Sequence, residues 1–189
     1  MADKNFMSWD GGGDDPPDHD VIVNPIGAGW LRGSWQDSAK FHKRQHCGFA
    51  RITVVDGGTE DAVDVNNGCN DNAFDFFVAS AGDTRVLTLK GGSSRNVFRY
   101  WLVKRHAPVV DIEVGDWSSY NVSRSRDNIF ERWVSSQGKP FTYAYRLGCK
   151  PKFVDMRVKH LWWRSIGLTV YWWAKYVWHI VLRAPDKRK

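Results

Sequence analysis

The sequence predicts an all-β fold in which short strands stack on one another, and three observations support this prediction. A pattern of apolar-x-apolar, a glycine turn and Asn-x-Phe recurs at offsets of 23–24 residues, or 32–33 where an insertion lies. Apolar residues alternate with other residues inside each copy, which is typical of half-buried strands. The copies are rich in β-branched and aromatic residues, which favour strands. A copy this short cannot bury its apolar side alone, so the copies are expected to stack.

Composition indicates one globular body behind a polar arm. The chain has 189 residues, 42% of them hydrophobic, with eleven Trp and a net charge of +6. Residues 1–20 contain six Asp and little to bury, so we expect a flexible acidic arm. Its Asp spacing does not match an EF-hand loop, and the three cysteines form no zinc motif. We therefore expect no metal and no cofactor. No signal peptide is recognised, which favours the cytoplasm.

The copies follow one another in order after residues 21–35, which are expected to cap the first copy. Each copy contributes one pair of inward-facing residues. These pairs are predicted to be Val63/Val65, Leu87/Leu89, Val110/Ile112, Tyr143/Tyr145 and Ile166/Leu168. Upstream, Ala39 and Phe41 match the pattern more weakly, 24 residues before Val63 and Val65. The body is accordingly predicted to span residues 21–164, and residues 165–189 to form aromatic terminal strands and a basic tail.

This pattern resembles the right-handed parallel β-helix of the pectate-lyase-like superfamily, over roughly residues 39–170. The resemblance implies about five rungs, with the inward pairs stacked as one sheet. It also implies that Asn72, Asn96 and Asn128 stack at one turn and hydrogen-bond along the axis. A plain preference for left-handed turn geometry is the other interpretation of these asparagines.

The segment YWWAKYVWHIVLR, residues 171–183, extends an apolar alternation from Ile166 to Leu182. Lys175 near the middle argues against a membrane-spanning helix. The alternation predicts terminal strand structure that closes the stack and joins subunits. The interface residues are then Tyr171, Trp173, Tyr176 and Trp178. A membrane or interfacial helix through residues 161–183 stays open as an alternative.

Two carboxylates are candidate catalytic residues for glycan cleavage. Asp111 and Glu113 alternate with apolar residues, so both side chains are expected to point outward, about 6.5–7 Å apart along the strand. That separation is compatible with glycoside hydrolysis. Arg95 and Arg99 are expected to face the same side. The alternative is an ordinary solvated face with Asp–Arg pairs between rungs. No GxSxG elbow, phosphate loop or Cys/His motif points to other chemistry.

The insertion GDWSSYNVSRSRDN, residues 115–128, is the candidate binding loop. It carries Trp117, Tyr120, Arg124 and Arg126. Aromatic and arginine side chains on a loop that projects from a rigid scaffold are suited to a glycan or a protein partner.

The resemblance implies a non-enzymatic structural or adhesion component of a phage or virus particle, such as a tail, spike or capsid decoration. Its expected partners are copies of itself, other virion proteins and a cell-surface glycan. Among homo-oligomers, a trimer is the favoured expectation. No nucleic acid is expected, and a membrane is not the favoured partner. The expected location is the virion, assembled in the host cytoplasm. The alternatives are a polysaccharide lyase or glycoside hydrolase, and a membrane-associated virion component anchored through residues 161–183.

Overall fold

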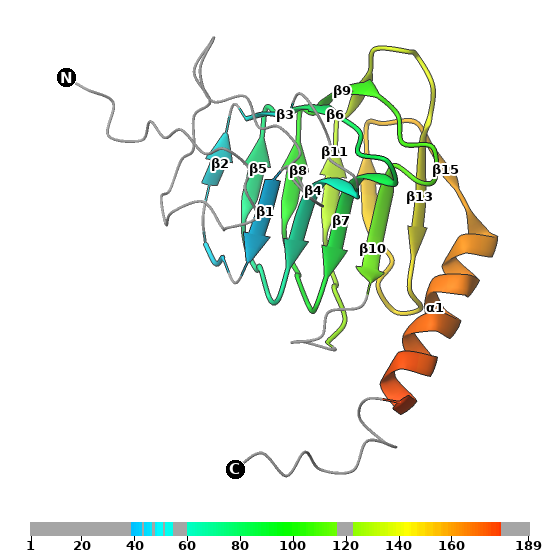
Figure 1. Ribbon diagram of the computed structural model, residues 1–189. Helices are drawn as coiled ribbons and strands as arrows, with labels where there is room; N and C mark the ends of the chain where they lie inside the picture. The colour runs from blue at the N-terminus through cyan, green and yellow to red at the C-terminus, as the bar shows by residue number, and fades with distance from the viewer. Residues whose placement is uncertain are drawn as a thin grey trace.

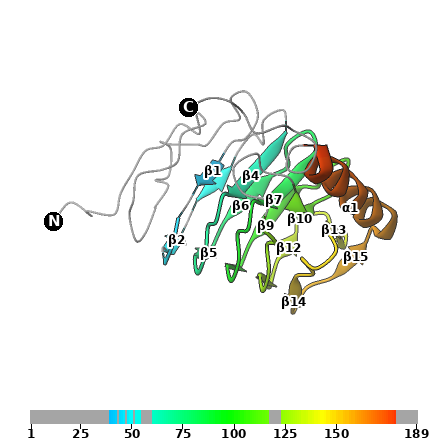
Figure 2. The same cartoon turned by 90° about the horizontal axis from the view of Figure 1, so that it is seen from below.

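The computed structural model describes residues 39–42, 44–46, 48–50, 52–54, 60–116 and 123–178. These residues form a parallel β-solenoid of three sheets, followed by one C-terminal helix (Figures 1 and 2). The predicted all-β body of about five rungs is thereby confirmed. The predicted arm, the predicted cap at residues 21–35, Trp117 and Tyr120 lie outside the described residues.

The first four rungs each take one strand from each sheet. All described strand pairs are parallel. The first sheet contains β1 (Ala39–His42), β4 (Asp61–Asn66), β7 (Arg85–Lys90), β10 (Ile112–Asp116), β13 (Phe141–Tyr145) and β15 (Val158–His160). The second contains β2 (Gly48–Ala50), β5 (Ala73–Asp75), β8 (Val97–Arg99), β11 (Ile129–Glu131) and β14 (Lys152–Val154). The third contains β3 (Thr53–Val54), β6 (Val78–Ser80), β9 (Leu102–Arg105) and β12 (Val134–Ser135).

Aromatic side chains from equivalent positions stack along the axis inside the solenoid. Phe74 and Phe98 lie with ring centroids 4.8 Å apart, and Phe98 and Phe130 follow at 4.9 Å. Trp101 and Trp133 form a second stack at 4.4 Å. These five rings are buried, and aromatic pairs of this geometry contribute beyond their buried area.

Asn72, Asn96 and Asn128 form a continuous amide ladder. Asn72 Nδ2 donates to Asn96 Oδ1 at 2.9 Å, and Asn96 Nδ2 donates to Asn128 Oδ1 at 3.1 Å. The positive φ angles belong to the residue before each asparagine, for example Arg95 at 57°. Hydrogen bonding along the axis, rather than left-handed turn geometry, therefore explains these asparagines.

The register of the fourth rung differs from the prediction by two residues. Ile112 pairs with Leu87 and Val114 with Leu89, whereas Val110 and Ile112 had been expected there. The prediction aligned Gly115 with the turn glycine Gly92, but Gly115 lies within β10 where the register shifts. A slip of two residues keeps the same side chains facing inward, so the predicted core residues of this strand are still buried.

The predicted terminal strand at residues 165–183 is wrong, because Trp162–Tyr176 form the helix α1. Strand β15 pairs with residues Phe141–Tyr143 of β13, and the chain then turns into α1. Ser165 and Leu168 are buried and Trp172 is half-buried, which is the spacing of a helix face. The alternation misled because most residues here are apolar, so they fit a strand period and a helix face alike. A helix satisfies its own backbone hydrogen bonds, so it can close the stack without exposing another strand edge. Within the described residues, no helix has the length and apolar content needed to cross a bilayer.

Candidate functional site

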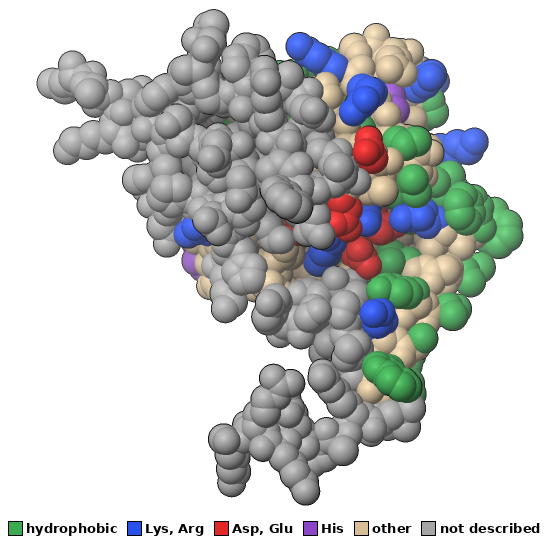
Figure 3. Space-filling view, viewed as in Figure 1, with side chains coloured by type: hydrophobic (Ala, Val, Ile, Leu, Met, Phe, Trp, Pro, Cys, Tyr) green, Lys and Arg blue, Asp and Glu red, His purple; other side chains and the backbone are tan. Residues whose placement is uncertain are grey.

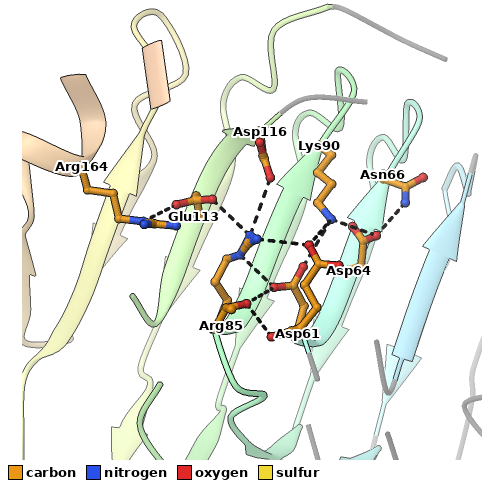
Figure 4. Close-up of polar contacts among 10 residues, drawn as sticks. Asp61, Asp64, Asn66, Arg85, Lys90, Glu113, Asp116 and Arg164 are labelled. Carbon is orange, nitrogen blue, oxygen red and sulfur yellow. Dashed lines mark hydrogen bonds and ion pairs between the residues drawn. The ribbon is translucent and has the colours of Figure 1, made fainter. Parts of the chain in front are cut away.

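A network of charged side chains lies on the first sheet, between its central strands and α1 (Figure 4). Asp64 on β4, Thr88 on β7 and Glu113 on β10 are register neighbours. They share the parity opposite to the core residues, so their side chains point to the outer face. Asp61 and Arg85, the first residues of β4 and β7, are also register partners.

Arg85 is the centre of this network. Its Nε atom lies 2.8 Å from Asp61 Oδ1, its Nη1 atom 3.3 Å from Glu113 Oε1, and its Nη2 atom 3.3 Å from Glu60 Oε1. Asp116 Oδ2 is 3.7 Å from Nη1. Burial lowers the pKa of the Arg85 guanidinium, but the surrounding carboxylates raise this pKa by more, so it is higher than usual. Arg85 is therefore a permanent cation that joins three rungs.

Glu113 uses both of its carboxylate oxygens. Oε1 faces Arg85, and Oε2 lies 2.6 Å from Nε of Arg164 on α1. Burial raises the pKa of the Glu113 carboxyl, Asp116 raises it further, and the two arginines oppose this rise. The Arg164 pair ties the helix to the sheet.

A cavity of about 400 Å³ lies beside this pair, between α1 and the sheet. Its lining combines the carboxylates Glu60, Glu113 and Asp116 with Arg85, Arg164, Trp163, Gly167, Leu168 and Tyr171. Acidic groups beside aromatic rings suit a polar ligand that also has apolar faces. No group of three His, Cys, Asp or Glu side chains among the described residues is placed to hold a metal ion.

The outer face of α1 forms a second feature, which we call the α1 stripe: Trp162, Ile166, Val170, Trp173 and Val177. Their spacing of three or four residues places them on one side of the helix, and each is between 38% and 64% exposed. Figure 3 shows hydrophobic side chains along the helix, with basic and acidic side chains on the neighbouring part of the body.

The surroundings of the α1 stripe are basic. Between residues 139 and 178 the sequence has eight Lys and Arg and one acidic residue, Asp155. The described lysines of the last rung, among them Lys150, Lys152 and Lys159, are exposed. Exposed apolar side chains grouped on one face of a helix are typical of an interaction surface.

Asp111 and Glu113 do not face a common site. Asp111 is buried and does not line the cavity. Its Oδ1 accepts the N–H of Ala107 at 2.9 Å, and its Oδ2 accepts the N–H and hydroxyl of Thr142 at 2.8 and 2.9 Å. Oδ2 also lies 2.9 Å from His106 Nδ1. The predicted paired carboxylates are thus held by separate sets of partners.

The expected position of Arg95 and Arg99 is also wrong. They pair with Asp71 and Asp75 across the second sheet, at 2.7 Å each. This matches the alternative of Asp–Arg pairs between rungs.

The predicted binding arginines lie at the end of the insertion. Arg124 and Arg126 are both exposed. The Arg124 side chain passes close to Gly148, and the Arg126 N–H donates to Ser94 Oγ at 2.9 Å. Their backbone is thus anchored to the neighbouring rung, and their charges face outward.

The four predicted interface residues are distributed around α1 and its end. Trp173 belongs to the α1 stripe, whereas Tyr171 lines the cavity. Tyr176 stacks on Trp172 at 5.0 Å, and Trp178 is exposed beyond the helix. The strand prediction therefore found exposed aromatics but not the surface that they form.

Several residues of these sites were missed by the sequence analysis. Arg85, Arg164, His106 and Ser135 carried no motif. The pairs Arg85–Asp61, His106–Ser135 and Arg164–Glu113 span 24, 29 and 51 residues of sequence. The only available signal for Arg85 was its offset of 24 residues from Asp61, one repeat length. Comparison with protein-family models, with curated proteins and with solved structures found no match to this chain.

Proposed function

We propose that this chain is a structural scaffold that attaches to an anionic membrane surface through the α1 stripe. The observation that supports this proposal is the stripe itself, a row of exposed Trp, Ile and Val side chains in basic surroundings. Helices that lie in the plane of a membrane interface combine an apolar face containing Trp with Lys and Arg beside it. The solenoid provides a rigid body that sets the orientation of the helix.

The pairing of α1 with the body supports this role. Arg164 and Leu168 face the sheet, and Arg164 is engaged by Glu113. The helix is thus held from one side while the α1 stripe stays exposed on another. An attachment surface that is already helical does not lose folding entropy on binding.

Charge distinguishes a membrane from a second copy of the chain. Symmetric pairing through the α1 stripe would bring two basic surfaces together, and like charges oppose such contact. An anionic headgroup layer instead attracts each nearby Lys or Arg. Trp side chains favour the headgroup level because their rings are amphipathic.

Flotation with vesicles tests the proposal. The full chain is expected to float with vesicles of phosphatidylcholine containing about one-third phosphatidylglycerol, and to bind phosphatidylcholine alone more weakly. Ile166→Glu is expected to reduce binding at least about tenfold, because it places a charge in the helix face that would enter the lipid. The matched control is Val134→Glu, which changes an exposed valine on β12 by the same charge. Equal binding of the two variants would refute the α1 stripe as the attachment surface.

The broader role, a tail, spike or capsid-decoration component of a virus particle, rests on the repeat resemblance and on the rigid stacked body. In this role the solenoid acts as a rod that contacts virion proteins or surface glycans, and copies of the chain assemble as a homo-oligomer. Light scattering on the purified chain without lipid tests the assembly. A discrete oligomer that Ile166→Glu dissociates would assign the α1 stripe to subunit contact instead of membrane contact.

The cavity beside Glu113 favours glycan cleavage as a second candidate function. A carboxyl group whose pKa is raised by burial can serve as a general acid, and Trp163 and Tyr171 provide rings for a sugar face. The test is the release of new chain ends from a set of acidic and neutral polysaccharides. Activity that Glu113→Gln abolishes while Glu131→Gln retains it would establish this function, and its absence on every polysaccharide would exclude Glu113 as the acid for them.

A further inference from the structure

Three side chains far from α1 form a continuous hydrogen-bonded chain. Ser135 Oγ lies 2.6 Å from His106 Nε2, and His106 Nδ1 lies 2.9 Å from Asp111 Oδ2. Ser135 is on β12, His106 follows β9, and Asp111 precedes β10. The solenoid thus brings together residues that no local motif links.

The partners determine the proton positions. An ionised carboxylate only accepts hydrogen bonds, so His106 Nδ1 must carry the proton that faces Asp111. In the neutral imidazole, Nε2 is then the acceptor, and Ser135 donates its hydroxyl proton to it. This is the arrangement in which a histidine activates a serine hydroxyl as a nucleophile.

Asp111 is held firmly in the orienting position. It accepts the N–H of Ala107, the residue after His106, and both donors of Thr142 on the next rung. A buried carboxylate with these bonds fixes the tautomer and direction of the imidazole and stabilises the imidazolium that forms in a reaction.

Backbone N–H groups lie beside the serine oxygen. The Gln137 N–H donates to Ser135 Oγ at 3.2 Å. The N–H groups of Val134 and Ser136 donate to the carbonyls of Trp101, just before β9, and of Val103 on β9. Alternate residues of a parallel strand point their amides to opposite sides, so the N–H of Ser135 points away from β9, toward the outer edge of the third sheet. Donors of this kind can stabilise an oxyanion.

A cavity of about 280 Å³ opens beside Ser135. Trp133, Phe141 and Met156 provide apolar surface, Lys139 and Arg157 provide positive charge, and Asp155 provides negative charge. The space suits a short acyl group, and the mixed charges of the lining suit a polar alcohol part.

We infer that Ser135, His106 and Asp111 form a catalytic centre that hydrolyses small carboxylic esters. Ser135 Oγ attacks the ester carbonyl carbon while its proton moves to His106 Nε2. The bond from carbon to the alcohol oxygen then breaks, and His106 returns the proton to the leaving alcohol. Water attacks the acyl-serine with His106 as base, which releases the carboxylic acid and restores the Ser135 hydroxyl. This activity goes beyond the scaffold role and does not depend on α1.

Covalent labelling with a fluorophosphonate, together with hydrolysis of p-nitrophenyl acetate, tests the inference on the full chain. We expect one adduct, on the peptide that contains Ser135, and no adduct in Ser135→Ala. Ser135→Ala should lower kcat/KM at least about 100-fold. The control is Ser136→Ala, which removes the neighbouring exposed hydroxyl that bonds to the Lys104 carbonyl. It should keep both the adduct and the hydrolysis.

The second variant, His106→Gln, distinguishes a catalytic role from hydrogen bonds that only stabilise the contact between rungs. His106→Gln should lose labelling and hydrolysis. Ser135→Ala should keep a circular-dichroism spectrum and a melting temperature close to those of the wild type. No labelling of the wild-type chain, labelling that Ser135→Ala retains, or unchanged hydrolysis in Ser135→Ala would each overturn the inference. These outcomes leave the vesicle result untouched, so the two proposals fail separately.

Discussion

Ser165 on α1 accepts a hydrogen bond from the backbone N–H of Tyr145 on β13, at 3.0 Å. One helical turn later, Thr169 Oγ1 accepts the N–H of Leu147 at the same distance. Four helix residues rise about 6 Å, and two strand residues rise about 6.6 Å. The two hydroxyls therefore match two alternate amides of the chain, at the end of β13 and just after it. The helix takes the place of the next strand as their hydrogen-bond partner.

Removal of these hydroxyls should loosen the last rung. Thr169→Val keeps the shape of the side chain but removes the acceptor, and we expect a loss of about 1 kcal/mol in the free energy of unfolding. Amide hydrogen exchange at Leu147 should become faster, because the local opening costs less. Thr169→Ser keeps the hydroxyl and serves as the control. Equal exchange at Leu147 in the two variants would show that this bond does not stabilise the edge.

Arg85 should be far more important for stability than the similar Arg99. Arg85→Met leaves Asp61 and Glu113 buried without their shared cation, so we expect a loss of about 3–5 kcal/mol. Arg99→Met breaks a more exposed pair with Asp75 and should cost less than about 1 kcal/mol. Urea unfolding of both variants provides the comparison. Similar losses would contradict the central role of Arg85.

Glu113 should make stability depend on pH. Its folded-state pKa is raised above the value of 4.5 by burial, so the folded chain holds a proton that the unfolded chain releases. The protonated carboxyl contributes fully to the stability of the fold below the ordinary pKa of the unfolded chain. This contribution is lost as pH rises through the raised pKa of the folded chain. Glu113→Gln imitates the protonated form at every pH, so the variant should gain stability relative to the wild type as pH increases.

Urea unfolding between about pH 4 and pH 8 measures this difference, with one pKa unit corresponding to about 1.4 kcal/mol. Asp83→Asn, at an exposed position, corrects for the removal of one acidic group. If the wild type instead becomes more stable relative to Glu113→Gln as pH rises, Arg85 and Arg164 lower the pKa of Glu113 by more than burial raises it.

Gly115 should tolerate alanine less well than Gly138. Both have positive φ angles, 89° and 67°, so alanine carries a conformational cost of about 1–2 kcal/mol at either position. A Cβ atom on Gly115 would also lie 2.7 Å from Cys149 Sγ, whereas nothing lies within 4 Å of one on Gly138. Thermal or urea unfolding should show an additional loss of about 1–3 kcal/mol for Gly115→Ala. Equal losses would mean that Cys149 moves away freely.

Repeated residues made much of the body predictable. The offset of 24 residues between Val63 and Leu87 is the observed register, because neighbouring rungs must place like side chains above one another. The fourth rung was misread by two residues, since a glycine within a strand and a glycine in a turn look alike in sequence. The hydrogen-bonded chain of Ser135, His106 and Asp111 and the charged network around Arg85 were largely beyond prediction, because residues such as His106 and Ser135 are joined by the winding of the chain and not by local spacing.

The sequence by itself determined that short strands stack, which side of each strand faces inward and where the asparagines align, because these properties follow from periodic apolar and amide side chains. The tertiary structure alone decided the conformation of residues 162–176. Their apolar pattern suits a strand or a helix, and the choice depends on the edge that they meet. Hydroxyls on the helix bond the amides of Tyr145 at the end of β13 and of Leu147 just after it, so the chain ends its solenoid with α1 and leaves the α1 stripe exposed.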